Sequence, residues 1–268
     1  MKKELAIAFV IYNPNEFFAE RVQLLLDEDY YVYIYDNSND YQMLNHMVSK
    51  NHIIYVTNKG NDGLGYGINN LAKRAYDDGF ESLLFFDQDT GFNFETLRFI
   101  RKAYSENKDN FHNVAVINFN NLYNKSQELF KKTDLVINSG SLFILKNLEI
   151  MGWHDKTFFV DGVDYKFCVD AKIKKFEILS VTSTPGFDHI SEQDDSDYKI
   201  FGKLYRFRKY SSFRVKDYIK SSIRLIMYAF KNKEFKYSYI FSKYLFYYIV
   251  VQSYVRCFEL VTKRKKND

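Results

Sequence analysis

The stretch that most constrains the fold is Ser82–Phe94, in which a short apolar run ends abruptly in two aspartates. Residues 83–86 are Leu-Leu-Phe-Phe, which is typical of a strand buried on both faces of a mostly parallel sheet. Such sheets bind ligands just beyond the carboxyl ends of their strands. Asp87 and Asp89 would then face a hard cation such as Mg²⁺ or Mn²⁺, which holds phosphate oxygens. The alternative is a solvated turn closed by Gly91.

Strands and helices alternate through the first ninety residues. Apolar runs at residues 4–12, 30–35 and 53–56 come before the run at 83–86, and segments 17–26, 41–48 and 68–75 have helical spacing. This alternation predicts a doubly wound α/β sheet. Because the first, second and fourth strands each end in polar residues, we expect Asn13, Asp36 and Asp87 along one edge, where a nucleotide would lie.

A glycine-rich stretch follows the third strand and contains Gly63, Gly65 and Gly67. It resembles a dinucleotide fingerprint only loosely, because such a fingerprint follows the first strand and has a different spacing. Two interpretations stay open. The glycines form a flexible turn before a helix, or they let the backbone approach a base or ribose closely.

The second half of the chain continues the pattern, with a helix expected over residues 94–105 and strands over 113–119 and 176–182. The apolar run at 135–145 is interrupted by the small polar residues Asn138–Ser141. Buried polar groups without partners are costly. The interruption therefore fits either a segment passing under a ligand or a strand with a bulge at Gly140.

A second pair of aspartates, Asp161 and Asp164, follows an aromatic segment and begins a helical pattern. A carboxylate near a helix start is favoured by the unpaired N–H groups there, so Asp164 is either a helix N-cap or a general base. In the second case Trp153, Phe158 and Phe159 would form an aromatic pocket beside the base and bind an acceptor.

His189 follows the strand expected over residues 176–182. It is either an ordinary surface residue or a nitrogen ligand for the same cation as the aspartates after the fourth strand.

The C-terminal part is basic and aromatic. Between residues 203 and 236 there are eleven Lys and Arg against Asp217 and Glu234. No nucleic-acid-binding motif accompanies this charge, so an anionic membrane surface is the favoured partner. Charged residues interrupt the stretch at 239–261, which therefore predicts helices packed on the catalytic domain or lying in the interface rather than a membrane span.

The two cysteines, Cys168 and Cys257, form neither a disulfide framework nor a zinc spacing, which suits a reducing cytosol. The apolar run near the N-terminus is short and lacks a small-residue cleavage site. We expect it to be the first strand rather than a signal peptide.

Six motifs occur in a fixed order between residues 4 and 210. They are Ile11–Pro14, Tyr35–Ser38, Asn58–Gly60 with Gly63–Asn69, Phe86–Thr90, Phe159–Asp164 and His189. Together they resemble the inverting glycosyltransferases of family 2, most closely the rhamnosyltransferase-like branch. The resemblance implies a GT-A fold, with a Rossmann-like nucleotide-binding mixed sheet flanked by helices.

The resemblance assigns the nucleotide sugar to the first half of the chain. The turn after the first strand packs on the base, the carboxylate after the second strand recognises the base or ribose, and the loop after the third strand closes over the base. The first aspartate of the Asp-x-Asp turn meets the ribose. Tyr12 and Pro14 belong to the turn that packs on the base, and Asp36 is the carboxylate after the second strand. Asn58, Gly60 and Gly63 belong to the closing loop, and Asp87 is the aspartate that meets the ribose.

The resemblance also implies the chemistry. Asp89 corresponds to the direct ligand of Mn²⁺ or Mg²⁺, and His189 to the histidine that helps to hold the metal and diphosphate. Asp164 occupies the position of the catalytic base, with Asp161 nearby.

Two departures from the family pattern are visible. The acidic residue two positions after the base and the arginine six positions after it are replaced by Lys166 and Asp170, a swap that can keep an ion pair across one helical turn. The Gln-x-x-Arg-Trp motif of processive synthases is missing, which predicts transfer of one or a few sugars.

The implied enzyme moves a sugar from dTDP-rhamnose, or from a UDP-sugar such as UDP-galactofuranose, to a bacterial cell-surface glycan or lipid-linked acceptor. We expect a catalytic domain over residues 1–202, with a nucleotide-sugar half at about 1–92 and an acceptor half at about 93–202. A basic helical extension covers 203–268. The expected location is the cytoplasmic face of the plasma membrane, and a homodimer is left open.

Two other functions compete with this one. A non-catalytic module that binds nucleotide sugars or polyanions would need neither the Asp-x-Asp turn nor Asp164. A nucleotidyltransferase also uses paired aspartates on an α/β sheet, but it would carry a glycine-rich basic loop after the first strand. Here that position is Asn13–Glu16.

Overall fold

The structure is a computed structural model that describes residues 3–38, 44, 52–120, 128–181, 187–189, 196–200 and 203–267. The helix expected at residues 41–48 lies outside the described residues, apart from Leu44. The chain divides into two compact units, Met1–Ile190 and Ser191–Asp268. The division expected from the sequence lies a little later, between residues 202 and 203.

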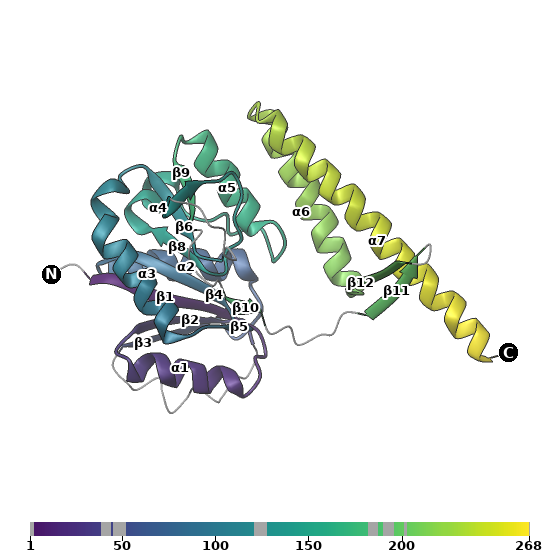
Figure 1. Cartoon of the computed structure of the whole chain (residues 1–268), viewed down its shortest axis with the longest axis horizontal. Helices are drawn as coiled ribbons and strands as arrows, with labels where there is room; N and C mark the ends of the chain where they lie inside the picture. Colours follow the sequence, from purple (N-terminus) through teal and green to yellow (C-terminus); the bar gives the residue numbers. More distant parts are fainter. Residues whose placement is uncertain are drawn as a thin grey trace. The chain divides into compact units, whose positions relative to one another are not determined.

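The first unit is an α/β unit built around one large sheet (Figure 1). Its strands are β1 (Lys3–Ile11), β2 (Tyr31–Asp36), β3 (Ile53–Thr57), β4 (Phe80–Asp87), β5 (Thr90–Gly91), β6 (Val114–Asn118), β7 (Phe130–Lys132), β8 (Ser141–Ile144), β9 (Glu177–Val181) and β10 (Asp188–His189). Its helices are α1 (Phe17–Asp27), α2 (Leu64–Asp77), α3 (Phe94–Asn107), the short 3₁₀ helix η1 (Lys108–Asn110), α4 (Leu145–Met151) and α5 (Val163–Ile173).

The large sheet has the strand order β3-β2-β1-β4-β8-β6-β9-β7. Strands β3, β2, β1 and β4 run parallel. Strand β8 lies antiparallel between β4 and β6, and β9 runs parallel to β6. The expected mixed sheet flanked by helices is therefore confirmed.

Strand β1 is buried on both faces because helices cover each side of it. Its residues Leu5, Ile7, Phe9 and Ile11 join one apolar core with side chains of α1 and α3. On the opposite face α2 comes so close that a Cβ atom on Gly67 would lie 2.7 Å from the side chain of Val10. This double coverage explains why β1 and β4 read as continuous apolar runs.

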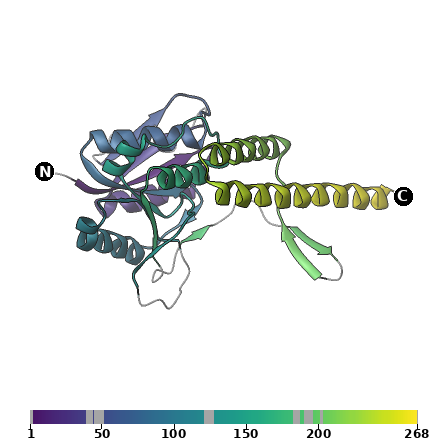
Figure 2. The ribbon, with the colours of Figure 1, turned by 90° about the horizontal axis from the view of Figure 1, so that it is seen from above.

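The second unit consists of a hairpin and two long helices. Strand β11 (Ser196–Ile200) pairs with β12 (Lys203–Phe207), and α6 (Ser212–Lys231) lies beside α7 (Phe235–Asn267) (Figure 2). Within the helix pair the buried side chains include Leu225 and Ala229 of α6 and Tyr237 and Phe241 of α7.

One segment of this unit departs from its sequence pattern. Residues 205–210 have helical apolar spacing, but residues up to Phe207 belong to β12, where Tyr198 and Tyr205 pair across the hairpin. Among the described residues, no helix has the length and apolar character required to cross a bilayer.

Candidate functional site

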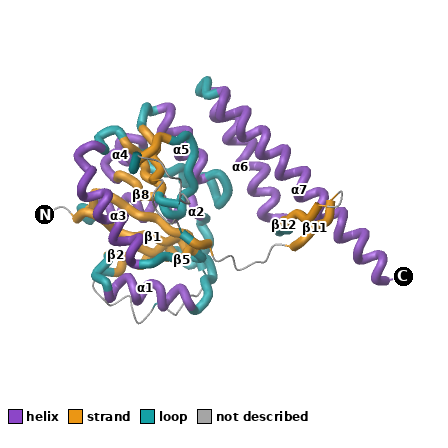
Figure 3. The backbone as a smooth tube through the Cα atoms, viewed as in Figure 1, coloured by secondary structure: helices purple, strands orange, loops and turns teal. Residues whose placement is uncertain are grey.

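The carboxyl ends of three neighbouring strands meet at one edge of the sheet, where loops gather beside β5 (Figure 3). The strand registers place Ile11 opposite Asp36, and Val10 opposite Asp87. The turn after β1, the end of β2 and the Asp-x-Asp turn after β4 are therefore adjacent, as the sequence predicted.

The side chain of Gln88 attaches the Asp-x-Asp turn to the turn after β1. The backbone N–H of Tyr12 donates to Gln88 Oε1 at 2.7 Å, and Gln88 Nε2 donates to the carbonyl of Tyr12 at 3.3 Å. The Tyr12 side chain is 53% exposed next to this attachment, whereas Pro14 is buried. An exposed aromatic ring is thus presented at the edge.

Ser139 holds the turn from the other side. Its hydroxyl accepts from the backbone N–H of Asp87 at 3.2 Å and lies 2.7 Å from the hydroxyl of Thr90. Asn118 Nδ2 donates to the Ser141 hydroxyl at 2.9 Å, so the buried hydroxyls of Ser139 and Ser141 both have partners. The interruption of the apolar run therefore lies directly beneath the Asp-x-Asp turn.

A third contact comes from α1 and was not predicted from the sequence. Arg21 Nη1 donates to the carbonyl of Thr90 at 2.7 Å, and Nη2 donates to the carbonyl of Gln88. These carbonyls flank Asp89 on both sides.

Asp89 itself stays available for a ligand. Its side chain is partly exposed, and no hydrogen bond or ion pair joins its carboxylate to another residue that the structure describes. The backbone of His189 in β10 pairs with that of Thr90 in β5, next to Asp89.

Whether these residues fit a divalent ion follows from their donor atoms. The side chain of His189 lies outside the described part of the chain, and the described residues alone contain no group of three His, Cys, Asp or Glu arranged to hold a metal. The carboxylate of Asp89 is an oxygen donor of the kind that Mn²⁺ accepts, and the role of His189 as a second ligand stays a prediction.

Asp164 lies in the first turn of α5 and is close to Asp87. The pKa of Asp164 is raised to about 7, mainly by loss of hydration and also by the negative charges of Asp87 and Asp161. A hydrogen bond of 2.8 Å from the backbone N–H of Tyr165 opposes the rise. Asp164 is partly exposed as a residue, and a carboxylate with this pKa suits proton transfer near neutral pH.

The alternative role of Asp164 as an N-cap is wrong. The N-cap is Gly162, with φ of +83°, and Asp164 follows two residues later inside the helix. The positive φ explains why a glycine stands at this position.

The swapped charges on α5 do form the expected ion pair. The Lys166 ammonium donates to both oxygens of Asp170 at 2.8 and 2.6 Å and lies 3.9 Å from Asp155. Lys166 is buried, so the pair fixes the inner side of the helix that carries Asp164.

The glycine-rich stretch packs against the segment that leads to Asp161. A Cβ atom on Gly63 would lie 2.4 Å from the carbonyl oxygen of Phe159, and one on Gly65 would lie 2.3 Å from that of Phe158. The backbone N–H of Leu64 donates to the Phe159 carbonyl at 2.5 Å. The close approach expected here is therefore made with protein backbone, a possibility that neither sequence interpretation included.

Asp36 lies at the predicted edge but is only 1% exposed. One carboxylate oxygen accepts from the backbone N–H of Ser38 at 2.7 Å, and the other accepts from the hydroxyl of Tyr55. Asp36 thus shapes the loop after β2, and its role toward a base or ribose stays a prediction.

Asn58 also lies at this edge and belongs to a hydrogen-bonded group. Its Nδ2 donates to the hydroxyl of Tyr35 at 2.8 Å and to Asp62 at 2.9 Å, and the Tyr35 hydroxyl donates to Asp62 at 2.6 Å. Sequence reasoning missed Tyr35 and Asp62. Gly60 has open space around its Cα, because no atom lies within 4 Å of a Cβ placed there.

The structure does not bring Trp153 next to Phe159, its predicted partner in the aromatic pocket. The ring of Trp153 packs edge-on against Tyr76 at 5.5 Å between centroids, and Tyr76 lies in the last turn of α2. Gly63 precedes the first turn of the same helix. Trp153 is therefore near the opposite end of α2, whereas Phe159 lies against Gly63.

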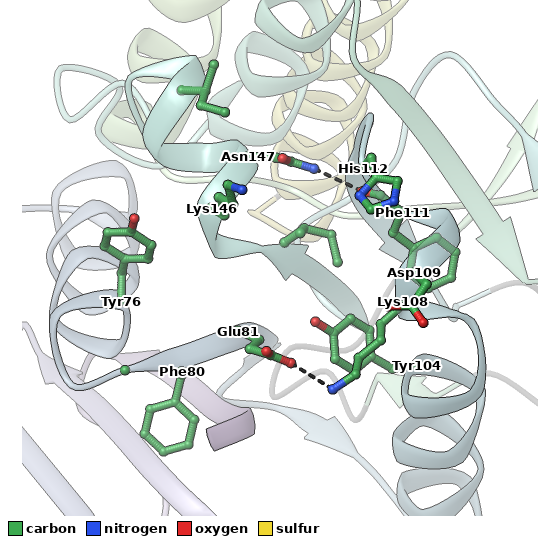
Figure 4. Close-up of a pocket in the computed structure, with 13 residues that line it drawn as sticks. Tyr76, Phe80, Glu81, Tyr104, Lys108, Asp109, Phe111, His112, Lys146 and Asn147 are labelled. Carbon is green, nitrogen blue, oxygen red and sulfur yellow. Dashed lines mark hydrogen bonds and ion pairs between the residues drawn. The ribbon is translucent and has the colours of Figure 1, made fainter. Parts of the chain in front are cut away.

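A cavity of about 660 Å³ lies near the start of β4 and contains none of the predicted site residues (Figure 4). Phe80, Glu81 and Tyr104 line it, and Lys108 Nζ lies 3.1 Å from Glu81 Oε2. Because β4 begins at Phe80 and ends at Asp87, this cavity belongs to the other edge of the sheet.

No protein-family model matches the chain. In sequence, the chain is 25% identical to the dTDP-rhamnosyl transferase RfbF of Shigella flexneri over 226 residues, which are 75% of this chain and 73% of that protein.

Solved structures share the fold. The chain is similar to S. aureus TarS 1–349 in complex with UDP-GlcNAc, with a TM-score of 0.55 and 16% identity over 84% of this chain and 66% of that chain. It is also similar to GalNAc-T7 with UDP, GalNAc and Mn²⁺, with a TM-score of 0.55 and 11% identity over 74% of this chain and 44% of that chain. The chain thus spans less than two thirds of these structures, and the expected GT-A type of mixed α/β fold is confirmed.

Proposed function

We propose that this chain, whose resemblance to the family 2 glycosyltransferases is confirmed, transfers a single sugar from a nucleotide-diphosphate donor to a hydroxyl group, with inversion. The observation that carries the proposal is the position of Asp164 beside Asp87, with its pKa raised to about 7. A general base is thus held next to the Asp-x-Asp turn, at the edge where such sheets bind nucleotides.

The donor is proposed to lie across the ends of β1, β2 and β4. The exposed ring of Tyr12 offers a face for the base, and the open backbone at Gly60 allows a close approach. The Shigella flexneri relative is named a dTDP-rhamnosyl transferase, which favours dTDP-rhamnose, and a UDP-sugar is the alternative. The proposed donor-binding residues are Tyr12, Pro14, Asp36, Asn58, Gly60, Gly63 and Asp87.

Asp89 and His189 are proposed to hold Mn²⁺ or Mg²⁺. Such an ion, when bound, would neutralise negative charge on the leaving diphosphate. The open carboxylate of Asp89 and the strand pairing of His189 beside it support this role. The Mn²⁺ in the GalNAc-T7 structure agrees with it.

Asp164 is proposed to take the proton from the acceptor hydroxyl. The acceptor oxygen then forms a bond to the anomeric carbon, while the bond from that carbon to the diphosphate breaks on the opposite face. Loss of hydration, with smaller contributions from the charges of Asp87 and Asp161, raises the pKa of Asp164 and keeps it basic. Phe159, which lies against Gly63 and precedes Asp161 by two residues, is proposed to contact the acceptor.

The test of this function separates binding from turnover. We expect Asp164→Asn to bind donor and Mn²⁺ like the native chain in a thermal-shift panel of nucleotide sugars, because ligand binding raises stability. Turnover should fall about 10²–10⁴-fold. Near-native activity of the variant would remove Asp164 from the reaction, and activity that survives EDTA would remove the metal role of Asp89.

Membrane association is proposed for the helices of the second unit. Met227 and Phe230 on α6 and Tyr239 and Phe246 on α7 are each more than 60% exposed, on helices rich in Lys and Arg. Such a combination suits the surface of an anionic membrane, which would place a lipid-linked or cell-surface glycan acceptor near the enzyme. Failure of the full chain to sediment with phosphatidylglycerol vesicles would contradict this proposal.

A further inference from the structure

Arg21 makes an unusual contact for a residue on a sheet-covering helix. Its guanidinium crosses from α1 to the Asp-x-Asp turn and donates to the carbonyls of Gln88 and Thr90. The contacted residues lie immediately before and after Asp89. A guanidinium is a rigid planar fork, so two simultaneous bonds fix both the spacing and the direction of these carbonyls.

The support for this fork is rigid. Arg21 is one helical turn from Phe18, which is fully buried and packs edge-on against Phe9 of β1 at 5.2 Å. The Arg21 guanidinium lies 5.8 Å from the centre of the Phe18 ring. Buried Val22 and Leu25 continue the apolar face of α1, so the helix already has a firm attachment to the sheet without Arg21.

The orientation of Asp89 depends on the backbone of its turn. Among the described residues, no partner holds the Asp89 carboxylate, so its direction follows from the main chain of residues 88–90. Ser139 fixes this main chain through Asp87 and Thr90, and Arg21 fixes the two carbonyls next to Asp89. The Arg21 guanidinium thus contacts main-chain carbonyls on both sides of the proposed ligand.

We infer that Arg21 is a positioning residue that pre-orients Asp89 for a divalent cation. The inference rests on the proposed function, because it takes Asp89 as the metal ligand. In this inference Arg21 is not a ligand of the ion but acts through its bonds to the carbonyls of Gln88 and Thr90. Partners that orient a metal ligand in this way typically contribute about 10–100-fold in metal affinity.

The experiment measures Mn²⁺ affinity of the full chain without donor, from the electron paramagnetic resonance signal of free Mn²⁺. We expect Arg21→Met, which keeps the length but loses the donors, to weaken binding about 10–100-fold. Arg21→Lys keeps the charge but not the planar fork and should lie between Met and native. Arg98→Met is the matched control, because Arg98 is an exposed arginine of the same unit whose ion pair is with Glu28 at 3.7 Å.

A second measurement separates positioning from mere stability. At a temperature well below unfolding, excess Mn²⁺ should restore the turnover of Arg21→Met, because the variant lacks affinity rather than a ligand. Excess Mn²⁺ should not restore Asp89→Asn.

If Arg21→Met folds and binds Mn²⁺ as tightly as the native chain does, the inference is overturned. The proposed metal site stands in that case, because the native chain still binds Mn²⁺. If Arg21→Met does not fold, native affinity in Arg21→Lys overturns the inference instead. A native chain that binds no Mn²⁺, either alone or with saturating dTDP or UDP to supply phosphate oxygens, would overturn the metal role of Asp89 and the inference together.

Discussion

The ends of β2 and β4 each deliver an aspartate to the same edge of the sheet, but the protein treats the two carboxylates in opposite ways. Asp36 is buried, and one of its oxygens accepts a hydrogen bond from Ser38 while the other accepts one from Tyr55. Asp89 is partly exposed and has no such partner among the described residues. An aspartate that follows an apolar strand can therefore either hold its own loop in place or leave its carboxylate open to a ligand.

The strongest test of this difference is Asp89→Asn. We expect turnover with Mn²⁺ to fall by about 100-fold or more, because a charged ligand is lost where the leaving group develops charge. The thermal midpoint should stay nearly native, since the substitution breaks no contact of the described structure. Steady-state kinetics and thermal unfolding check the two expectations. A clear loss of stability with activity retained would break the comparison.

Asp36→Ala should behave in the reverse way. We expect the free energy of unfolding to fall by about 1–3 kcal/mol, because the Ser38 N–H and the Tyr55 hydroxyl lose a buried acceptor. Urea unfolding measures the change, and Tyr55→Phe is the control that removes one of the two bonds. If Asp36→Ala is as stable as the native chain but binds donor weakly, Asp36 is an open ligand like Asp89.

His154 extends the comparison to a buried ring whose nitrogens have no hydrogen-bond partner among the described residues. It is 2% exposed and stacks on Phe167. Burial lowers the pKa of His154 from 6.5 to about 3, so below pH 6.5 the unfolded chain binds a proton that the folded chain does not.

Stability should therefore fall as the pH is lowered from 7 to 5, by about 2 kcal/mol from this group. Urea unfolding at the two pH values measures the loss. His154→Leu should reduce it, because leucine does not titrate. An unchanged pH dependence in that variant would show that His154 takes up its proton in the folded state as readily as in the unfolded one.

Asp164 is intermediate between the open and the filled carboxylates, with one backbone hydrogen bond and partial exposure. Its pKa of about 7 predicts that turnover rises about tenfold between pH 6 and pH 8, because only the deprotonated carboxylate accepts the proton. A pH–rate profile at saturating donor checks this, with an Asp161→Asn variant as comparison. Loss of the negative charge at residue 161 should move the midpoint to lower pH.

The parts of the site that follow from local sequence were predictable. The strands that carry Asp36, Asp87 and Asp89 are visible as apolar runs, and the register of a parallel sheet places their ends together. The ion pair of Lys166 and Asp170 follows from their spacing on a helix. In each case the interacting residues are close in sequence or belong to adjacent regular elements.

The parts that depend on distant side chains could not be read in the same way. Arg21 reaches residues almost seventy positions later in the chain, and Ser139 reaches Asp87 from the turn before β8. Nothing in the local pattern around Arg21 distinguishes it from a solvated helical arginine. The burial of Asp36 depends on Tyr55, a residue of a different strand, and the strand pairing of β12 overrode the helical spacing of residues 205–210.

The contact of Gly63 and Gly65 with the carbonyls of Phe159 and Phe158 has a consequence for protein engineering. It ties the loop proposed to close over the donor to the segment leading to Asp161, so neither can be redesigned alone. A chimera that imports residues 1–92 of a relative with a different donor would place foreign side chains against the native Phe158 backbone. Exchanging Asp155–Phe159 in the same step would keep the two surfaces matched.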